Sequence, residues 1–171
     1  MSTDKNNPTE LKEVVIKPMT LTKEGKELIM FYEGCHLEAY LCPAKIPTVG
    51  FGSTFYSNGS KVKLGDKITH KEAVKLFDVI VEKFAKDVRS VLVRNITNAQ
   101  FSAIVSFAFN VGMGNLKLST LLKKVNKNPL DTTIPSEFLR WNKAKGIELS
   151  GLTKRRTSES ILYSSGKFKI V

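Results

Sequence analysis

The sequence has few cysteines, few histidines and no long apolar run, and each shortage excludes a class of protein. Its two cysteines, Cys35 and Cys42, are too few for the disulfide framework of a small secreted domain. Neither has histidine or cysteine neighbours at the spacing of a zinc site, and His36 and His70 carry no ligand pattern. We therefore expect no metal and no cofactor, and we expect both histidines at the surface.

Long hydrophobic segments are also missing. The first twenty residues contain charged side chains and no apolar stretch of signal-peptide length. The longest apolar stretch, residues 101–113, is interrupted by polar side chains and is too short to span a bilayer. We expect a protein that is soluble when made and does not insert stably into membranes, so that action outside the cytoplasm needs a separate means of release.

Acidic residues are outnumbered, with 16 Asp and Glu against 27 Lys and Arg, and the formal net charge is +11. A field of this sign favours polyanionic partners such as nucleic acid, an anionic membrane or an anionic bacterial envelope. The basic residues are scattered, without the aromatic-interleaved stripe or motif of a nucleic-acid-binding protein, so we expect no nucleic-acid partner. The length of 171 residues fits one monomeric domain with two lobes.

Local patterns divide the chain into an arm, a β-rich segment and a series of helices. Residues 1–19 are polar with little periodicity, and we expect them to form an arm ahead of a domain over 20–171. A helix is predicted to start near Thr20 or Thr22 and to end around Glu33, where the following glycine favours termination. Turn and β-favouring residues then predict a small antiparallel lobe over about 34–66, with Asn58-Gly59 as its strongest hairpin signal.

Two capping boxes mark the helices that follow. Thr69 with Glu72 precedes five turns of amphipathic pattern, which predicts a long helix linking the lobes. Thr97 with Gln100 opens a helix that is apolar nearly all round, as expected at the centre of a lobe. Shorter helices are expected at roughly 118–126, 134–143 and 153–163. The predicted fold is therefore α+β, with a helical lobe over about 69–171 plus the first helix, and a cleft between the lobes.

Glu33 is the candidate proton donor, because it lies at a helix end and faces a turn-rich segment. Cleavage of a glycosidic bond needs a proton donor beside the leaving oxygen and a second group that manages water on the opposite face. A glutamate partly desolvated in a cleft can stay protonated near neutral pH and fill the first role. Without further information, the simpler interpretation is that Glu33 caps or solvates a helix end.

The segment from Glu33-Gly34 through Thr48-Val49-Gly50-Phe51-Gly52 resembles the active-site signature of the phage-type lysozymes, glycoside hydrolase family 24. The family's catalytic glutamate falls on Glu33, its second catalytic position nine residues later on Cys42, and its threonine fifteen residues later on Thr48. The likeness covers roughly residues 20–164 and continues in Asn98–Phe101, Ser106–Gly112, Ser119–Leu122, Arg140–Asn142 and Gly151–Arg156. It implies the two-lobed α+β lysozyme fold.

This resemblance implies an endolysin, a muramidase that hydrolyses the β-1,4 bond between N-acetylmuramic acid and N-acetylglucosamine in peptidoglycan for host cell lysis. Glu33 would act as general acid, while Cys42 and Thr48 would hold and activate the attacking water. Arg156 is a candidate ion-pair partner of Glu33. Weaker candidates that would line or support the cleft are Ser53, Asn110, Ser119, Arg140, Trp141 and Arg156, each of which also has a purely structural interpretation.

Two positions depart from the commoner family pattern. Position 42 is usually Asp, and Cys42 is a weaker resident anion, because a few per cent of an unperturbed thiol is ionised at pH 7. It could act as a thiolate base, as a water-positioning group or as a nucleophile, and the stereochemical outcome is open. Ser53 stands where His is frequent. A disulfide between Cys35 and Cys42 would block the site in an oxidising compartment, although a free buried thiol is the simpler interpretation of Cys35.

Three alternatives remain open from the sequence. A lytic transglycosylase needs only one glutamate, so the absence of Asp at position 42 keeps this chemistry available. A non-catalytic cationic protein could act on the cell wall or the membrane through its charge, and a basic nucleic-acid-binding protein is the weakest alternative. If the resemblance holds, the protein is made in the host cytoplasm, is released through a holin pore and acts on the cell wall.

Overall fold

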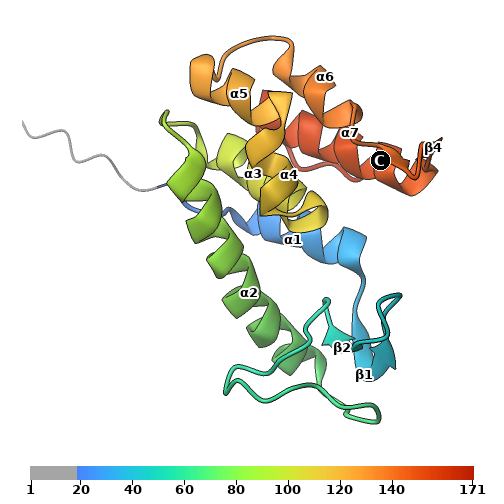
Figure 1. The fold of residues 1–171 in the computed structure, drawn as a ribbon. Helices are drawn as coiled ribbons and strands as arrows, with labels where there is room; N and C mark the ends of the chain where they lie inside the picture. Colours follow the sequence, from blue (N-terminus) through green and yellow to red (C-terminus); the bar gives the residue numbers. More distant parts are fainter. Residues whose placement is uncertain (1–18) are drawn as a thin grey trace, which may run out of the picture.

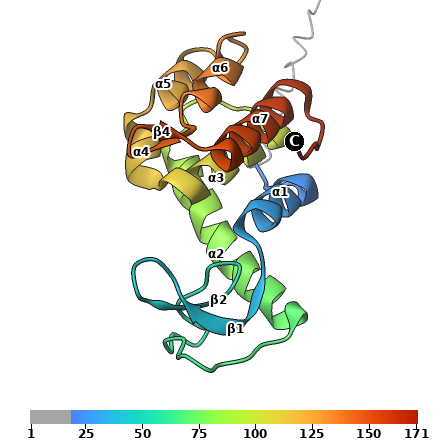
Figure 2. The same ribbon diagram turned by 90° about the vertical axis from the view of Figure 1, so that its right-hand side faces the viewer.

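The computed structural model describes residues 19–171, in which a long helix joins a small β-containing lobe to a helical lobe (Figures 1 and 2). The arm expected over residues 1–19 lies, apart from Met19, outside the described residues and stays a prediction. The elements in chain order are α1 (Lys23–Glu33), β1 (His36–Leu41), β2 (Pro47–Gly50), α2 (His70–Val91), α3 (Asn98–Val111), α4 (Met113–Leu118), α5 (Thr120–Lys127), α6 (Ile134–Leu139), β3 (Lys143–Ala144), β4 (Ile147–Glu148) and α7 (Ser150–Ser165).

The smaller lobe is built on the antiparallel hairpin of β1 and β2, in which Tyr40 pairs with Thr48. Its turn is closed by the Cys42 amide, which donates to the Ile46 carbonyl at 3.1 Å. The expected hairpin at Asn58-Gly59 is only a tight turn, flanked by a single bridge. The asparagine–glycine signal thus marks a turn correctly, whereas the paired strands lie earlier in the chain.

Both predicted capping boxes are present. The Thr69 hydroxyl accepts from the Glu72 amide and the Glu72 carboxylate accepts from the Thr69 amide, which starts α2. Thr97 and Gln100 make the equivalent pair at the start of α3. Each box satisfies backbone donors that the first helical turn would otherwise leave unpaired, and so it fixes the residue at which the helix begins.

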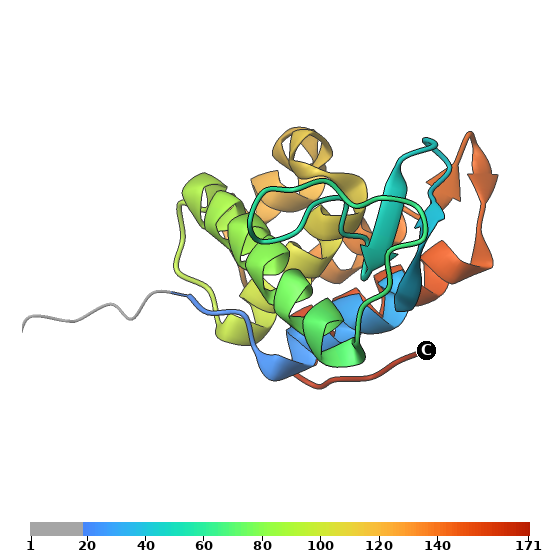
Figure 3. The same ribbon diagram turned by 90° about the horizontal axis from the view of Figure 1, so that it is seen from below.

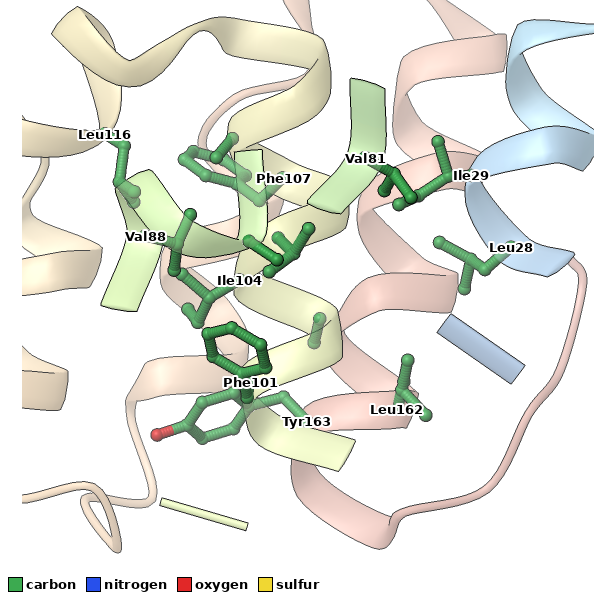
Figure 4. Packing of buried hydrophobic residues seen from close by; sticks show 14 of the residues in the cluster. Leu28, Ile29, Val81, Val88, Phe101, Ile104, Phe107, Leu116, Leu162 and Tyr163 are labelled. Carbon is green, nitrogen blue, oxygen red and sulfur yellow. The ribbon is translucent and has the colours of Figure 1, made fainter. Parts of the chain in front are cut away.

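Helix α3 forms the centre of the helical lobe, as its apolar sequence predicts. It packs against α1, α2, α4 and α7, and Figure 4 shows its Phe101, Ile104 and Phe107 within the buried cluster. These three side chains are fully buried. Burial of side chains this large contributes about 1.5–3 kcal/mol each, so α3 is the element to which the other helices are fixed.

The shorter helices differ in their bounds from the expected ones. Ser119 separates α4 from α5 because its hydroxyl accepts from the Leu122 amide at 3.0 Å and so begins a new helix. Helix α6 stops at Leu139, earlier than expected, and the short β3–β4 hairpin that follows was not predicted. This hairpin lies on the same side of the molecule as β1 and β2 (Figures 2 and 3).

Helices α1 and α3 cross at Gly25, and this crossing sets the position of the end of α1. A Cβ atom at Gly25 would lie 2.5 Å from the Ser102 Cβ, so only glycine allows this approach. The Thr22 amide donates to the Ser102 hydroxyl at 2.9 Å and fixes the start of α1 against α3. In the described part of the chain, no helix has both the length and the apolar character needed to cross a membrane.

Candidate active site

Glu33 is the last residue of α1 and lies where the chain leaves the helical lobe for β1. Gly34 follows with a φ of 70° and its amide donates to the Met30 carbonyl at 3.1 Å, which ends the helix. The Glu33 side chain is 24% exposed. Its carboxyl group is therefore partly screened from water and still reachable from outside.

Arg155 is the ion-pair partner of Glu33. Its Nη1 donates to Glu33 Oε1 at 2.7 Å, from the first turns of α7. The expectation that Arg156 would fill this role is wrong. Neighbouring residues of a helix point about 100° apart, and Arg156 instead donates from Nη2 to Asn110 Oδ1 at 2.8 Å and covers the Phe107 ring at 5.0 Å.

Arg155 is held from three directions. Besides Glu33, it donates from Nε to Glu159 Oε1 and from Nη2 to the Ser106 carbonyl, both at 3.3 Å. Its guanidinium group also lies over the Tyr32 ring at 5.7 Å. Arg155, Glu159 and Ser106 are almost completely buried, so the guanidinium group has little freedom to move away from Glu33.

Burial acts strongly on the charged groups behind Arg155. It raises the pKa of the Glu159 carboxyl, which the nearby guanidinium groups of Arg156 and Arg155 and a hydrogen bond from Ser106 oppose. It lowers the pKa of Arg156, which the Glu159 charge opposes. Each of these charges therefore depends on its partners to remain ionised inside the protein.

Cys42 and Thr48 come together at the turn between β1 and β2. Hydrogen bonds from the backbone of Ile46 and Ala44 and from the Thr48 side chain lower the pKa of the Cys42 thiol, against a smaller effect of burial. Thr48 is buried and its hydroxyl donates to the Ile46 carbonyl at 2.9 Å. A hydroxyl has one hydrogen and can donate only one hydrogen bond at a time. Once Cys42 ionises, Thr48 can rotate its hydroxyl and donate to the Cys42 sulfur instead of the Ile46 carbonyl.

The structure thus places the three predicted catalytic residues in two groups. Glu33 with Arg155 belongs to the helical lobe, and Cys42 with Thr48 belongs to the other lobe. No side-chain hydrogen bond or ion pair between described residues joins the groups. Cys35 is exposed, Cys42 is partly exposed, and both thiols are free. The disulfide between them stays a prediction.

Ser53 lies in the same lobe, directly after the Gly50-Phe51-Gly52 turn. Its backbone forms two hydrogen bonds of 2.9 Å with Val49, one in each direction, which close the turn. Its side chain is 1% exposed and its hydroxyl has no hydrogen-bond partner among the described residues. Ser53 therefore supports the backbone beside Thr48 but uses none of its own side-chain bonding capacity.

The remaining candidates support the helical lobe. Ser119 begins α5, as described above, and Trp141 packs edge-on against Phe107 with ring centres 5.4 Å apart. Arg140 is exposed and contacts Glu137 at 3.4 Å. Asn110 has a direct link to the site, because it holds Arg156 beside the Arg155–Glu159 pair. His36 and His70 are exposed, as expected.

Two hollows are lined by residues that belong to the candidate site or neighbour its members in the chain. One of about 610 Å³ lies between the loop after β2 and helix α2, and Gly52, Phe55, Val79 and Met113 are among its lining residues. The other, of about 390 Å³, is lined by Tyr32, Asn110, Leu149, Ser150, Gly151, Leu152 and Arg155. The second hollow adjoins Glu33 through its chain neighbour Tyr32 and its partner Arg155. Among residues 19–171, no cluster of three or more His, Cys, Asp or Glu side chains could hold a metal ion.

Sequence reasoning missed Tyr32, Glu159 and the correct arginine. The motif Gly151–Arg156 was recognised, but two adjacent arginines cannot be distinguished by spacing from a distant glutamate. The local signal was the i, i+4 spacing of Arg155 and Glu159, which places those two side chains on one face of α7.

The fold, the buried arginine–glutamate pair and the interlobe position of Glu33 together define a lysozyme-like protein. Residues 30–159 match the family model described as phage lysozyme, and the chain belongs to this family. It is 38% identical to an endolysin of Bacillus phage B103 over 155 residues, which is 90% of this chain and 57% of that protein. The alignment with the related endolysin of Bacillus phage PZA covers 58% of that protein. The chain therefore spans little more than half the length of these curated relatives.

Solved structures agree with this assignment. The endolysin from Escherichia coli O157:H7 phage FAHEc1 superposes with a TM-score of 0.80 at 33% identity, over 88% of this chain and 97% of that one. The muramidase domain of SpmX from Asticaccaulis excentricus has a TM-score of 0.75 at 26% identity, over 84% of this chain and 97% of that one. The predicted lysozyme-like α+β fold is confirmed.

Proposed function

We propose that this protein is an endolysin that hydrolyses the β-1,4 bond between N-acetylmuramic acid and N-acetylglucosamine in peptidoglycan and so lyses the host cell. The observation that carries this proposal is the carboxyl group of Glu33, held by a buried arginine at the junction of the two lobes. Relatives named endolysin and muramidase support it.

Glu33 supplies the proton in this mechanism. Arg155 occupies Oε1, which leaves Oε2 as the oxygen that carries the proton to the glycosidic oxygen. As that oxygen accepts the proton, its bond to the anomeric carbon of the muramic acid breaks. The leaving sugar departs with a free hydroxyl group, and Glu33 is left as a carboxylate paired with Arg155.

Cys42 and Thr48 act on the attacking water. A water molecule adds its oxygen to the anomeric carbon and gives a proton to the Cys42 thiolate, while Thr48 holds the water or the sulfur through its hydroxyl. The hydrogen bonds that lower the pKa of Cys42 support this role, because they increase the thiolate fraction near neutral pH. The product has a reducing end.

Digestion of purified peptidoglycan by the full chain, with mass analysis of the released muropeptides, tests the proposal. We expect reducing-end products, and we expect Glu33→Gln to lower the rate at least about 100-fold, the usual contribution of a general acid. Glu38→Gln is the matched control, because Glu38 is an exposed carboxylate on β1 whose ion-pair partner within residues 19–171 is Lys67 at 3.3 Å. It should keep wild-type activity.

Other results would identify the alternatives. Anhydro products would indicate a lytic transglycosylase that uses Glu33 alone. Equal killing of cells by wild type and Glu33→Gln would indicate a non-catalytic cationic protein. Intact peptidoglycan after incubation with wild type would end the proposal.

The setting of this activity is part of the same proposal. The partner is the glycan strand, the acting form is a monomer, and synthesis takes place in the host cytoplasm. Release depends on a holin, and the cell wall is the site of action. The relatives named as endolysins of Bacillus phages support this setting.

A further inference from the structure

A cluster of four charged side chains lies behind the candidate proton donor. With all four groups ionised, Glu33 and Glu159 contribute two negative charges and Arg155 and Arg156 two positive charges, so the formal charges cancel. Glu159 and Arg156 are 0% exposed, and the Arg155 side chain is 4% exposed. Among these four, Glu33 alone is substantially open to solvent.

Glu159 anchors Arg155 in this cluster. The Ser106 hydroxyl on α3 donates to Glu159 Oε1 at 2.7 Å, and the same oxygen accepts from Arg155 Nε at 3.3 Å. Arg155 then donates to Glu33 at 2.7 Å. A continuous chain of polar contacts therefore runs from the centre of the helical lobe through Glu159 and Arg155 to the carboxyl group of Glu33.

This cluster is a costly way to fill a core. Glu159 Oε2 and Arg156 Nε lie 3.2 Å apart, but neither atom has an aligned hydrogen bond within the described residues. Buried ion clusters of this kind are often replaced by apolar side chains without loss of stability. A role in stability alone therefore does not explain why these charges are buried. Their chain of contacts ends at the Glu33 carboxyl, and a role in positioning that group does explain it.

We infer that Glu159 is a positioning residue for the proposed reaction: it holds the Arg155 guanidinium group in place, and Arg155 in turn orients the Glu33 carboxyl. This inference rests on the proposed function, because it assigns Glu159 to the same proton transfer. Glu159 has no contact with the substrate and acts only through Arg155.

The inference has an electrostatic consequence. The groups that face Glu33 are Arg155 and Arg156 on α7, Glu159 behind them, and Tyr32 on α1, whose hydroxyl shares a hydrogen bond with Ser158. Glu159→Gln leaves the cluster with one net positive charge. This added positive charge acts on the reacting carboxyl, so the pH profile is a readout that a purely structural role of Glu159 would not move.

The test compares full-length wild type and Glu159→Gln on purified peptidoglycan across a range of pH. We expect kcat to fall on the order of 10- to 100-fold, the effect of a small misplacement of a reacting group. KM should stay within about twofold, because no contact with substrate is removed. The alkaline limb of the pH–kcat profile should move to lower pH.

A matched control distinguishes the loss of Arg155 positioning from a general loss of protein stability. Glu137 is also a buried glutamate of the helical lobe, paired with Lys124 at 2.7 Å, and it lies outside the cluster. Glu137→Gln should lower the melting temperature without moving the pH profile. If Glu159→Gln does not fold, as judged by circular dichroism, Glu159→Asp retains the charge and should lower kcat while leaving the pH limb in place.

A double-mutant cycle completes the experiment. In an Arg155→Gln background, Glu159→Gln should have no further effect on kcat, because its route to Glu33 is already lost. The inference is wrong if folded Glu159→Gln has wild-type kcat and pH profile, or if it lowers kcat by the same factor in both backgrounds. Failure of the proposed function would look different, since wild type itself would then leave peptidoglycan intact.

Discussion

The residue at position 42 determines how the proposed activation of the attacking water depends on pH. In the proposed mechanism the thiol must ionise before it can accept a proton, so activity rises as pH increases through the pKa of Cys42. The hydrogen bonds around the sulfur lower that pKa, but a carboxyl group ionises at far lower pH, about 3.9 for aspartate against about 8.5 for cysteine.

We therefore predict that Cys42→Asp moves the acid limb of the pH–rate profile lower by less than about 4.6 pH units, the difference between those ordinary values, because the hydrogen bonds already lower the thiol pKa. Activity at pH 7 should be kept or increased. Cys42→Ala removes the proton acceptor and should lose most of the activity. Initial rates of peptidoglycan hydrolysis across pH give the measurement, and an acid limb unchanged in Cys42→Asp would show that the thiol is a bystander.

The site residues also show how far an active site can be predicted from sequence. Glu33, Cys42 and Thr48 could be chosen because their spacing within one short segment carries the family signature. The choice of Arg156 over Arg155 was wrong, because helix phase relative to a residue 122 positions away is fixed by tertiary packing. Glu159 was missed because its i, i+4 spacing from Arg155 gains meaning only once Ser106 of α3 is known to hold the same carboxylate, and that tertiary contact leaves no local signal.

Among the helices, the crossing of α1 and α3 determines where the proton donor is placed. We predict that Gly25→Ala destabilises the protein by about 1–3 kcal/mol, because the new methyl group would overlap the Ser102 Cβ and force the helices apart. Urea unfolding followed by circular dichroism measures this change.

The control for this variant is Gly114→Ala in α4, where a Cβ atom meets no neighbour within 4 Å. There the substitution should be neutral or stabilising by up to about 1 kcal/mol, because alanine favours helix more than glycine does. Equal unfolding midpoints for the two variants would contradict the assigned role of Gly25. Activity of Gly25→Ala should also fall, since the end of α1 carries Glu33.

The elements that could be predicted are those with local signals. Thr69 and Thr97 begin α2 and α3 through contacts within three residues, which a sequence displays directly. The β3–β4 hairpin has two residues in each strand and a turn at Lys145 and Gly146, both with positive φ. Strands this short leave no alternating pattern, so their pairing depends on the surrounding lobe.

The whole molecule carries a formal charge of +11, and a cell wall with anionic polymers attracts it. We predict that lysis of intact wall particles slows as ionic strength rises from about 0.02 to 0.3 M, because salt screens this attraction over about 10 Å at 0.1 M. The rate should fall through a higher apparent KM, with kcat little changed.

Hydrolysis of a short, uncharged glycan fragment is the comparison for that experiment. Its rate should be nearly independent of salt, because local contacts in the site are unaffected by screening at these distances. Equal salt dependence for wall particles and the neutral fragment would show that the net charge has no part in wall association.

Glu33 and Arg155 come from opposite ends of the described chain, from α1 and from α7. A ribosome that has translated only the first 149 residues has already produced the carboxyl group but not the guanidinium group that orients it. In the proposed mechanism, Glu33 gains its ordered partner only when α7 emerges and packs against α3. Under the proposed function, this order of synthesis delays peptidoglycan cleavage until α7 has been made and has folded.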